Sequence, residues 1–512
     1  MSSTNQGADG AYPLLFERSV PGRRGVLPPA TTVPVAWNPE RLPASLRRAR
    51  APLLPELSEL DVVRHYSGLS QRNWGVDLGF YPLGSCTMKY NPKVNEAIAA
   101  LPGWQRLHPY QPEQTVQGAL QILFELERDL CALTGMAQAT LQPSAGAQAE
   151  LLGLLLIRAH HQHHDPAHAA RRRQIIVPDS AHGTNPASAA AAGYEVVQVR
   201  SNDRGLVDVK HLKELVGPQT AGLMLTNPNT LGLFEEDIET IAEIIHAAGG
   251  LLYYDGANLN AIVGIVRPAD MGFDIVHLNL HKTFSTPHGG GGPGAGVIAV
   301  TPPLAPFLPG PRVEYDAAKN QYHWRAAGPW TVGRLREFYG NFGVLLRAWA
   351  YIRSLGAEGL REVARTAVLN ANYCRAKLQD CLEVPYADRP CKHEFVASAR
   401  EVHRRTGLHA QDLAKGLLDR GFHAPTVAFP LIVEEALMCE PTETESLQTL
   451  DAFVDALQQV VHLAYTQPDE LRTAPHRAPV GRLDEVLANR HLKLRWLPDP
   501  PATGPTAEGP TP

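Results

Sequence analysis

Apolar and polar positions alternate in blocks between residues 175 and 300. The apolar blocks are QIIVPD, YEVVQV, AGLMLT, GLLYYD, DIVHLNL and GVIAV, and helical patterns such as ASAAAAAG, HLKELV and EDIETIAEIIHAAG separate them. Strands that are apolar throughout and alternate with helices are typical of a parallel sheet covered on both faces. The pattern therefore predicts an α/β fold with a mainly parallel sheet.

The flanking regions have different patterns. TVQGALQILFELERDLCALTG has apolar residues at helical spacing and ends in glycine, and a further helix is expected to begin near Ser144. From about residue 340 a long helical stretch is followed by the short candidate strands EFVASA and VAFPLIV, which indicates a smaller C-terminal α+β domain. The predicted organisation is a disordered start (1–10), an N-terminal extension and interface segment (11–110), a large domain (111–340), a small domain (341–495) and a disordered tail (496–512).

Composition restricts the classes of partner. The chain of 512 residues has 44% hydrophobic and 19% charged residues and a net charge of -5, so neither nucleic acid nor an anionic membrane is expected to bind it. No apolar run is long enough to span a bilayer, and the start does not resemble a targeting peptide. The six cysteines form no CxxC pair, which favours reduced thiols and a cytoplasmic protein.

Four of the predicted strands are followed by side chains that are useful in catalysis. In chain order these are His182, Thr226, Asp255, and the neighbours His281 and Lys282. Ligands of a parallel α/β sheet bind beyond the carboxyl ends of its strands. The fold would therefore bring these side chains to one edge of the sheet.

A turn of small residues lies before the first of these strands, at the predicted start of a helix. It consists of Ser144, Ala145, Gly146 and Ala147. Free backbone N–H groups and the positive end of the helix dipole make such a turn a suitable phosphate site. A phosphate site, a carboxylate, an imidazole and a lysine at one edge match the needs of pyridoxal phosphate, for which Lys282 would form the Schiff base and Asp255 would hold the ring nitrogen protonated.

Two other patterns are weaker signals. The run GGGGPGAG precedes a strand instead of linking a strand to a helix, so it does not indicate a dinucleotide site. RAHHQHHDPAH contains His160 and His164 at helical i, i+4 spacing, but no further ligand accompanies them. A solvated helix end is the preferred interpretation, and no metal site is predicted.

The longer motifs resemble a known family. DGAN at 255–258, NLHK at 279–282 and SAHGTNPASA at 180–189 resemble motifs of fold-type I pyridoxal-phosphate enzymes. YPLGSCTMKYNPKVNE at 81–96, HPYQPEQTVQG, TNPNTLGLFE, KTFSTPHGGGGPGAG, FHAPTVAFP and EPTETES are similar to motifs of glycine dehydrogenase (decarboxylating), the P-protein of the glycine cleavage system. These matches extend over most of residues 12–490.

The resemblance implies roles for residues at the matching positions. It implies that Lys282 bonds to the cofactor, that Asp255 contacts the ring nitrogen, that Ala257 packs on the ring and that His182 stacks on it. Phosphate contacts are implied for Ser144, Ala145, Gly146, Ala147, Thr226 and His281. His182 is also a candidate for handling a proton, and the resemblance does not separate these two roles.

The implied reaction is decarboxylation of glycine with transfer of the aminomethyl group to the lipoyl arm of H-protein. The length is about that of one half of the P-protein, and because the chain retains Lys282 it resembles subunit 2, the catalytic subunit of the two-subunit form. This resemblance implies a partner, subunit 1, in an α2β2 assembly. Two alternatives stay open: another fold-type I decarboxylase with a larger substrate, and a structural or regulatory subunit without activity. The segment GSCTMKYNP and the loop at His288 are candidates for lining a lipoyl channel or, equally, for sealing a subunit interface.

Overall fold

The computed structural model describes residues 12–30, 32, 39–50 and 52–494. The predicted disordered ends, 1–10 and 496–512, lie outside the described residues. Contacts divide the chain into two units, residues 1–78 and 79–512. The boundaries predicted at residues 110 and 340 fall inside the second unit and stay predictions. Among the described residues, no helix combines the length and the apolar character that crossing a membrane requires.

The first unit contains one longer helix, α1 (Glu59–Ser70), after two short 3-10 turns at Pro39–Arg41 and Ala44–Leu46. Ser58 and Asp61 cap the start of α1 reciprocally, since each side chain accepts a hydrogen bond from the backbone N–H of the other. Such a capping box satisfies two N–H groups that have no partner within the helix. The cap explains why α1 begins at Glu59.

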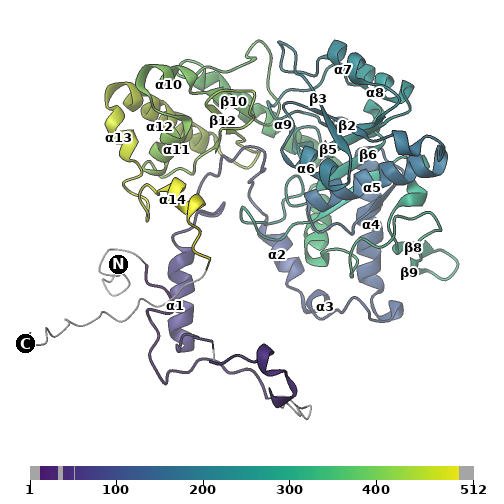
Figure 1. Cartoon of the computed structure of the whole chain (residues 1–512), viewed down its shortest axis with the longest axis horizontal. Coiled ribbons are helices and arrows are strands. Elements are labelled where there is room, and N and C mark those ends of the chain that lie inside the picture. The colour runs from purple at the N-terminus through teal and green to yellow at the C-terminus, as the bar shows by residue number, and fades with distance from the viewer. Residues whose placement is uncertain (1–11, 31, 33–38, 51, 495–512) are drawn as a thin grey trace, which may run out of the picture. The chain divides into compact units, whose positions relative to one another are not determined.

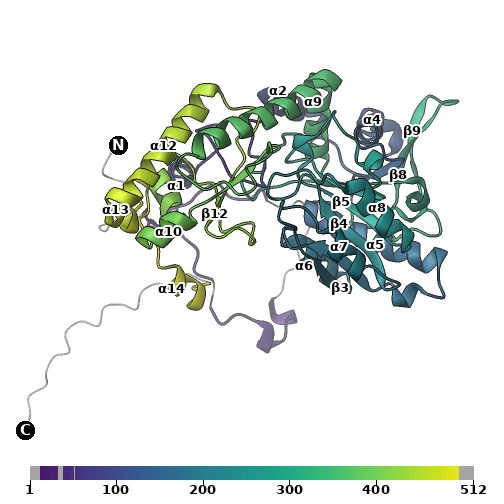
Figure 2. The ribbon, with the colours of Figure 1, turned by 90° about the horizontal axis from the view of Figure 1, so that it is seen from above.

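The second unit contains a seven-stranded sheet in the order β1-β7-β6-β5-β4-β2-β3 (Figures 1 and 2). The strands are β1 (Gln138–Thr140), β2 (Gln174–Pro178), β3 (Glu195–Val199), β4 (Thr220–Thr226), β5 (Leu251–Gly256), β6 (Ile275–Asn279) and β7 (Gly296–Val300). Pairing is parallel from β3 to β6, whereas β7 runs antiparallel to both β6 and β1. The predicted, mainly parallel sheet is confirmed.

Helices cover both faces of this sheet (Figure 2). They are α4 (Gln117–Thr134), α5 (Gly146–His164), α6 (Thr184–Ala191), α7 (Val209–Leu215) and α8 (Ile238–Ala247), preceded by α2 (Lys93–Ala99) and α3 (Pro102–Gln105). Successive residues of a strand point to opposite faces. Tyr254 accordingly packs in the core cluster with α4 and α8, while Tyr253 packs in the cluster with α5.

The edge of the sheet differs from the expectation that every strand is apolar and buried. In β3, Glu195, Val196 and Gln198 are exposed. Because β3 is the last strand of the sheet, one of its sides has no neighbouring strand. The hairpin β8 (Arg312–Asp316) and β9 (Gln321–Arg325) follows β7 and forms a separate two-stranded sheet.

The long helical segment α9 (Phe342–Leu378), which is kinked at Gly356, leads from the large sheet to a second, smaller α+β region (Figure 1). Its sheet has the order β10-β12-β11, with β10 (Phe395–Ser398), β11 (Thr426–Val427) and β12 (Ala436–Cys439). The accompanying helices are α10 (Arg400–Thr406), α11 (Ala410–Leu418), α12 (Leu447–Thr466), α13 (Pro468–Thr473) and α14 (Glu485–Arg490). The predicted C-terminal α+β domain is confirmed.

The strand expected over VAFPLIV is wrong for most of its length. Only Thr426 and Val427 pair with β12, and the chain then turns. Ala428 has a left-handed backbone (φ 55°), and Pro430 has no N–H to donate to a strand ladder. Val433 then packs beside β12 without continuing the strand, whereas Leu431 is exposed.

Candidate active site

A cavity of about 250 Å³ lies where β4, β5 and β6 end. Eight of the ten predicted site residues line it: Gly146, Ala147, His182, Thr226, Asp255, Ala257, His281 and Lys282. Ser144 and Ala145 are not among the lining residues. The backbone N–H and hydroxyl of Ser144 both donate to Gln148 Oε1, at 2.7 and 2.8 Å.

Lys282 reaches the cavity from the turn that follows β6. The strand ends at Asn279, and the N–H of Lys282 donates to the Asn279 carbonyl oxygen at 3.1 Å, which closes the turn. The Lys282 Nζ donates to the carbonyl oxygen of Ser85 at 2.8 Å. The side chain is thus half-buried and held by one backbone acceptor.

Asp255 is buried at the end of β5, where hydrogen bonds keep it ionised. Its Oδ1 accepts from the Ala257 N–H and its Oδ2 from Asn185 Nδ2, each at 3.0 Å. Burial opposes ionisation, but the facing His277 ring, the Asn185 amide and the Ala257 N–H outweigh it and hold the pKa of Asp255 below its usual value. A carboxylate with lone pairs still free can accept a further N–H from a ligand.

Glu150, which the sequence prediction missed, forms a carboxyl pair with Asp255. Asn185 Nδ2 donates to both members, at 3.2 Å to Glu150 and 3.0 Å to Asp255. Burial and the negative charge of Asp255 raise the pKa of Glu150 to about 8, so Glu150 is protonated at neutral pH. The signal was its spacing: Glu150 follows Gly146 by four residues, which places both on the same face of α5.

His277 was also missed, although the register of the sheet places it directly beside Asp255. Its Nε2 lies 3.5 Å from Asp255 Oδ1 and 2.9 Å from Asn279 Oδ1, and its Nδ1 lies 2.8 Å from the Tyr253 hydroxyl. Burial lowers the pKa of His277, and the neighbouring Asp255 carboxylate opposes this shift. These contacts fix the ring against the carboxylate.

The opposite part of the cavity offers hydrogen-bond donors. Helix α5 begins at Gly146, and no side chain caps its first turn. The backbone N–H groups of this turn therefore have no capping acceptor at the end of the helix that lines the cavity. Thr226 Oγ1 and His281 Nδ1 are buried and have no hydrogen-bond partner among the described residues. A Cβ on Gly294 would lie 2.4 Å from His281 Nδ1, so only glycine fits there.

These features fit the predicted cofactor. A phosphate would satisfy the helix N–H groups and the Thr226 hydroxyl, and a protonated pyridine nitrogen would satisfy Asp255. Burial, followed by the charges of His288 and Lys282, lowers the pKa of His281 to about 3, so its ring is neutral. The roles assigned to individual residues stay predictions, whereas their convergence on one cavity is observed.

His182 lines the same cavity ahead of α6. Its Nδ1 accepts the Thr184 N–H at 3.2 Å, which places the ring proton of the neutral form on Nε2. Desolvation and the charge of Lys282 lower the pKa of His182. Further lining residues that the sequence did not reveal are Ser85, Thr184, Thr230, Asn258 and Asn279.

A larger cavity, of about 400 Å³, lies away from this chemistry. Its walls come from α2, α3, the first half of α4 and the start of α9, with Trp104, Trp324 and Phe342 among them. It contains no Asp, Glu or Lys, and Arg347 on its wall is paired with Glu96 at 2.7 Å. The smaller cavity is therefore the candidate active site.

Sequence comparison places the chain among proteins of one kind. It is 55% identical over 483 residues to "Probable glycine dehydrogenase (decarboxylating) subunit 2" of Caldanaerobacter subterraneus subsp. tengcongensis, covering 94% of this chain and 98% of that protein. The protein of the same name from Listeria innocua is 55% identical over 486 residues, again with 94% and 98% coverage.

Solved structures share the fold. A glycine decarboxylase (P-protein) of the glycine cleavage system in inhibitor-bound form aligns with a TM-score of 0.68 at 23% identity, covering 82% of this chain and 94% of that one. A sphingosine-1-phosphate lyase of Burkholderia pseudomallei aligns with a TM-score of 0.60 at 16% identity, covering 83% and 94%. At these identities the structures establish the fold alone.

Two family profiles match successive parts of the chain. "Glycine cleavage system P-protein" matches residues 37–321, and "Glycine dehydrogenase, C-terminal domain" matches residues 363–475. The first match spans more than half of the chain, and the relatives above agree with it over nearly the whole length. The chain therefore belongs to the glycine cleavage system P-protein family.

Proposed function

We propose that the chain catalyses the pyridoxal-phosphate-dependent decarboxylation of glycine and transfers the remaining aminomethyl group to the lipoyl arm of H-protein. The observation that carries this proposal is the convergence of Lys282, Asp255 and the unpartnered donors at Thr226 and α5 on one cavity. Relatives that share 55% of the sequence are named for glycine decarboxylation, which supplies the substrate.

When bound, pyridoxal phosphate supplies an aldehyde that bonds to amines and a protonated ring that accepts electrons. Lys282 is the amine that anchors it, and Ser85 holds that amine at 2.8 Å when it is free. Asp255, kept charged by Asn185 and the Ala257 N–H, holds the proton on the ring nitrogen. The N-terminus of α5 and Thr226 bind the phosphate and so fix the orientation of the ring.

His182 is positioned to handle a proton. Its lowered pKa leaves the ring neutral near pH 7, with the proton on Nε2 as its bond to Thr184 requires. From Nε2 the neutral ring can donate a hydrogen bond that stabilises a developing thiolate, whereas transfer of a proton requires the imidazolium, which takes its extra proton from solvent. Stacking on the ring is compatible with this role, since both use the same orientation of the imidazole.

The cavity favours a small amino acid. Its volume of about 250 Å³ lies below the range of roughly 300–1,000 Å³ that pockets for larger ligands occupy. Glycine adds only a carboxylate and one carbon beside the cofactor.

Partners and location complete the proposal. The names of the relatives contain "subunit 2", which supports a partner subunit 1, and we propose an α2β2 assembly. Membership of the P-protein family supports lipoylated H-protein as the acceptor. We place the enzyme in the cytoplasm because the described cysteines are all free thiols.

Exchange of labelled bicarbonate into the carboxyl group of glycine tests the proposal. The chain, mixed with subunit 1 and lipoylated H-protein, should support exchange, and omission of any one component should abolish it. Lys282→Ala should lower exchange by at least about 10³-fold, because the anchoring amine is lost.

The competing hypotheses have different outcomes. Decarboxylation of a larger amino acid without H-protein would indicate another fold-type I decarboxylase. A chain that binds no pyridoxal phosphate in the presence of subunit 1 would indicate a structural or regulatory subunit. Borohydride reduction followed by peptide mapping should locate the cofactor on the peptide that contains Lys282.

A further inference from the structure

The acceptor of the Lys282 amine belongs to a turn with unusual backbone conformation. Ser85 and Thr87 have positive φ angles of 64° and 49°. Residues with a side chain rarely adopt this left-handed region, and they persist there only when the surrounding structure holds them. The turn must therefore be fixed by contacts outside itself.

Two buried glutamates from the small C-terminal sheet provide those contacts. Glu394, just before β10, accepts the Ser85 N–H on Oε2 at 2.8 Å, and Glu440, just after β12, accepts the Thr87 N–H on Oε2 at 2.8 Å. Both glutamates have 0% of their surface exposed. The small sheet thus holds the turn at two residues, Ser85 and Thr87.

The same turn points its Ser85 carbonyl oxygen at the reactive lysine. A continuous path of contacts runs from Glu394 to the Ser85 N–H, across that residue to its carbonyl oxygen, and on to Lys282 Nζ. Asn258, which lines the cavity, donates from Nδ2 to Glu394 Oε1 at 3.2 Å and closes the connection on the other side. The small sheet therefore contacts the cavity through two polar routes.

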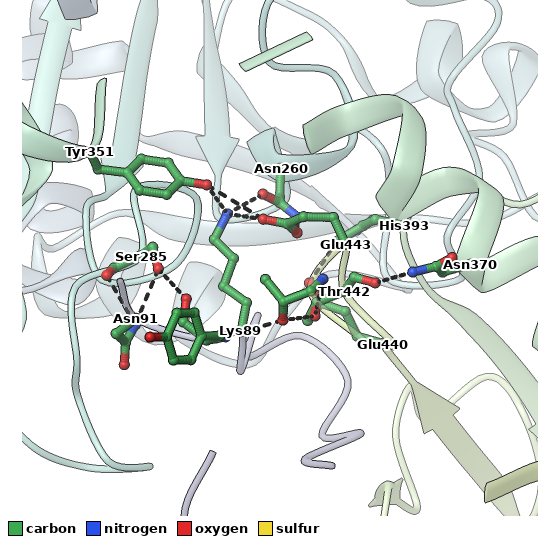
Figure 3. A network of polar contacts seen from close by, with 12 residues as sticks. Lys89, Asn91, Asn260, Ser285, Tyr351, Asn370, His393, Glu440, Thr442 and Glu443 are labelled. Carbon is green, nitrogen blue, oxygen red and sulfur yellow. Dashed lines mark hydrogen bonds and ion pairs between the residues drawn. The ribbon is translucent and has the colours of Figure 1, made fainter. Parts of the chain in front are cut away.

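Lys89, two residues after the turn, is held by a separate set of contacts (Figure 3). Lys89 is buried, and its Nζ contacts Glu443 Oε1 and Asn260 Oδ1, each at 2.8 Å, and the Tyr351 hydroxyl at 3.1 Å. Burial opposes its charge, but Glu443 and Tyr351 raise the pKa of Lys89, so the ion pair persists. The turn is consequently fixed at Ser85, at Thr87 and at Lys89.

The two glutamates favour the protonated form. Burial, with the neighbouring Glu440, raises the pKa of Glu394 well above its ordinary value, and burial raises the pKa of Glu440 to about 7. His393 Nε2 lies 3.8 Å from Glu440 Oε1 (Figure 3) and 3.9 Å from Glu394 Oε1, and both distances are too long for a hydrogen bond. The other titratable groups near the pair are Lys282, Cys86, Cys391, Cys439 and the Lys89–Glu443 ion pair.

We propose that Glu394 and Glu440 are positioning residues for Lys282. They hold the Ser85–Thr87 turn so that the Ser85 carbonyl oxygen receives the lysine amine whenever the lysine is not bonded to the cofactor. Their task is to accept backbone N–H groups, and a neutral amide can do this as well as a carboxyl group. The proposal rests on Lys282 as the anchoring lysine of the proposed function.

Paired substitutions separate geometry from charge. Each glutamate is changed to Gln and to Ala in the full chain assembled with subunit 1, and the cofactor is removed and added back. The absorbance of the lysine-bound cofactor then gives the rate of attachment. Glu394→Ala and Glu440→Ala should slow attachment by about tenfold each, because one hydrogen bond to the turn is lost. Glu394→Gln and Glu440→Gln should stay within about threefold of wild type, because the amide oxygen still accepts the N–H.

Two controls complete the series. Glu127 is a remote carboxyl group that accepts the Ala139 N–H and whose pKa burial raises to about 7, so Glu127→Ala matches the chemistry without contacting the turn. It should leave the attachment rate unchanged. Glu358→Gln removes a carboxylate on α9 whose side chain is 78% exposed, and it should likewise attach the cofactor at the wild-type rate.

Several results would overturn the proposal. Attachment at the wild-type rate in both alanine variants would remove the positioning role, and equal loss in the Gln and Ala variants would show that charge is required instead. Stoichiometric metal bound by wild type and lost in Glu440→Gln would make the cluster with His393 a metal site. If an alanine variant does not fold, attachment slowed by about tenfold in the corresponding Gln variant would still contradict a role limited to accepting an N–H group. Attachment that survives Lys282→Ala would instead refute the proposed function.

Discussion

Two buried carboxyl pairs flank Lys282, and each faces a histidine. In the cavity, Asp255 and Glu150 lie beside His277, while behind the Ser85 turn, Glu394 and Glu440 lie beside His393. The charge of Lys282 acts to lower the pKa of Asp255, Glu394 and Glu440 alike. The net shifts nevertheless differ. The pKa of Asp255 is lowered, whereas the pKa values of Glu150, Glu394 and Glu440 are raised.

The contacts of the two histidines account for the difference. Both nitrogens of His277 have partners, in Tyr253 and Asn279, and the ring stands 3.5 Å from Asp255. Neither nitrogen of His393 has a hydrogen-bond partner among the described residues, and its ring stands farther from both carboxyls. Burial alone thus favours neutral acids, and a charged acid requires donors that are already oriented toward it. In the proposed function, one pair supplies charge to the cofactor, and the other supplies fixed hydrogen-bond acceptors.

Replacing the charged acid should have the largest effect. Asp255→Asn should retain bound pyridoxal phosphate, because the phosphate contacts are unaltered, but glycine exchange should fall by about 10²-fold or more, because the ring loses its proton and its electron demand. Exchange and bound cofactor are measured on the same preparation. Wild-type exchange in Asp255→Asn would refute the role of this carboxylate.

The double variant Asp255→Asn/Glu150→Gln sharpens the result. The charge of Asp255 contributes to the raised pKa of Glu150, so its removal should allow Glu150 to ionise at lower pH. If ionised Glu150 supports the exchange that remains in Asp255→Asn, this remaining exchange should disappear in the double variant. Equal exchange in the single and double variants would show that Glu150 does not take over the charge.

Glu440→Gln should change the pH dependence of stability instead of the chemistry. Because the pKa of Glu440 is raised from 4.5 to about 7, its stabilising contribution is complete below pH 4.5 and is lost as pH rises through 7. Gln cannot ionise, so the variant keeps its stability as the pH rises. Its free energy of unfolding relative to wild type should therefore increase between pH 4.5 and 8, by up to about 3 kcal/mol. Melting temperatures of the two proteins across this range measure the difference.

Glu358→Gln is the matched control for that measurement. It removes a carboxylate on α9 whose side chain is 78% exposed, where solvent screens the charge. Its melting temperature should follow that of wild type at every pH. A constant difference between Glu440→Gln and wild type would mean that Glu440 has the same protonation in the folded and unfolded chains.

Local patterns were sufficient to predict the large sheet and the principal site residues. All six apolar blocks between residues 175 and 300 became β2 to β7, since each is flanked by helical or turn-forming residues. Lys282 and Asp255 could be found because a parallel sheet carries residues from the ends of successive strands to one edge. These two residues could be predicted because the topology of the sheet alone brings the ends of its strands together.

The missing parts depend on contacts between distant segments. Glu394 and Glu440 reach the Ser85 turn across 309 and 353 residues, respectively, and no periodicity in the sequence links such positions. The strand β12 has only four residues, and the strands of the hairpin β8–β9 are mostly half-buried or exposed, so they contain no apolar block that would reveal them. Ser144 does not line the cavity for a local reason, since Gln148 accepts hydrogen bonds from both its N–H and its hydroxyl.

Glu150→Gln should have the smallest effect, and its pH dependence tests the contrast between the two pairs most directly. With a pKa of about 8, Glu150 is protonated at pH 7, where the Gln amide has nearly the same shape and the same neutral charge. Exchange by the variant should therefore lie within about threefold of wild type below pH 8. Above pH 8 only the wild type gains a second negative charge beside Asp255, so the two pH profiles and the absorbance of bound cofactor should separate there. Profiles that already differ at pH 6.5 would show that Glu150 is ionised in the folded chain, and the cavity would then hold two charged acids instead of one.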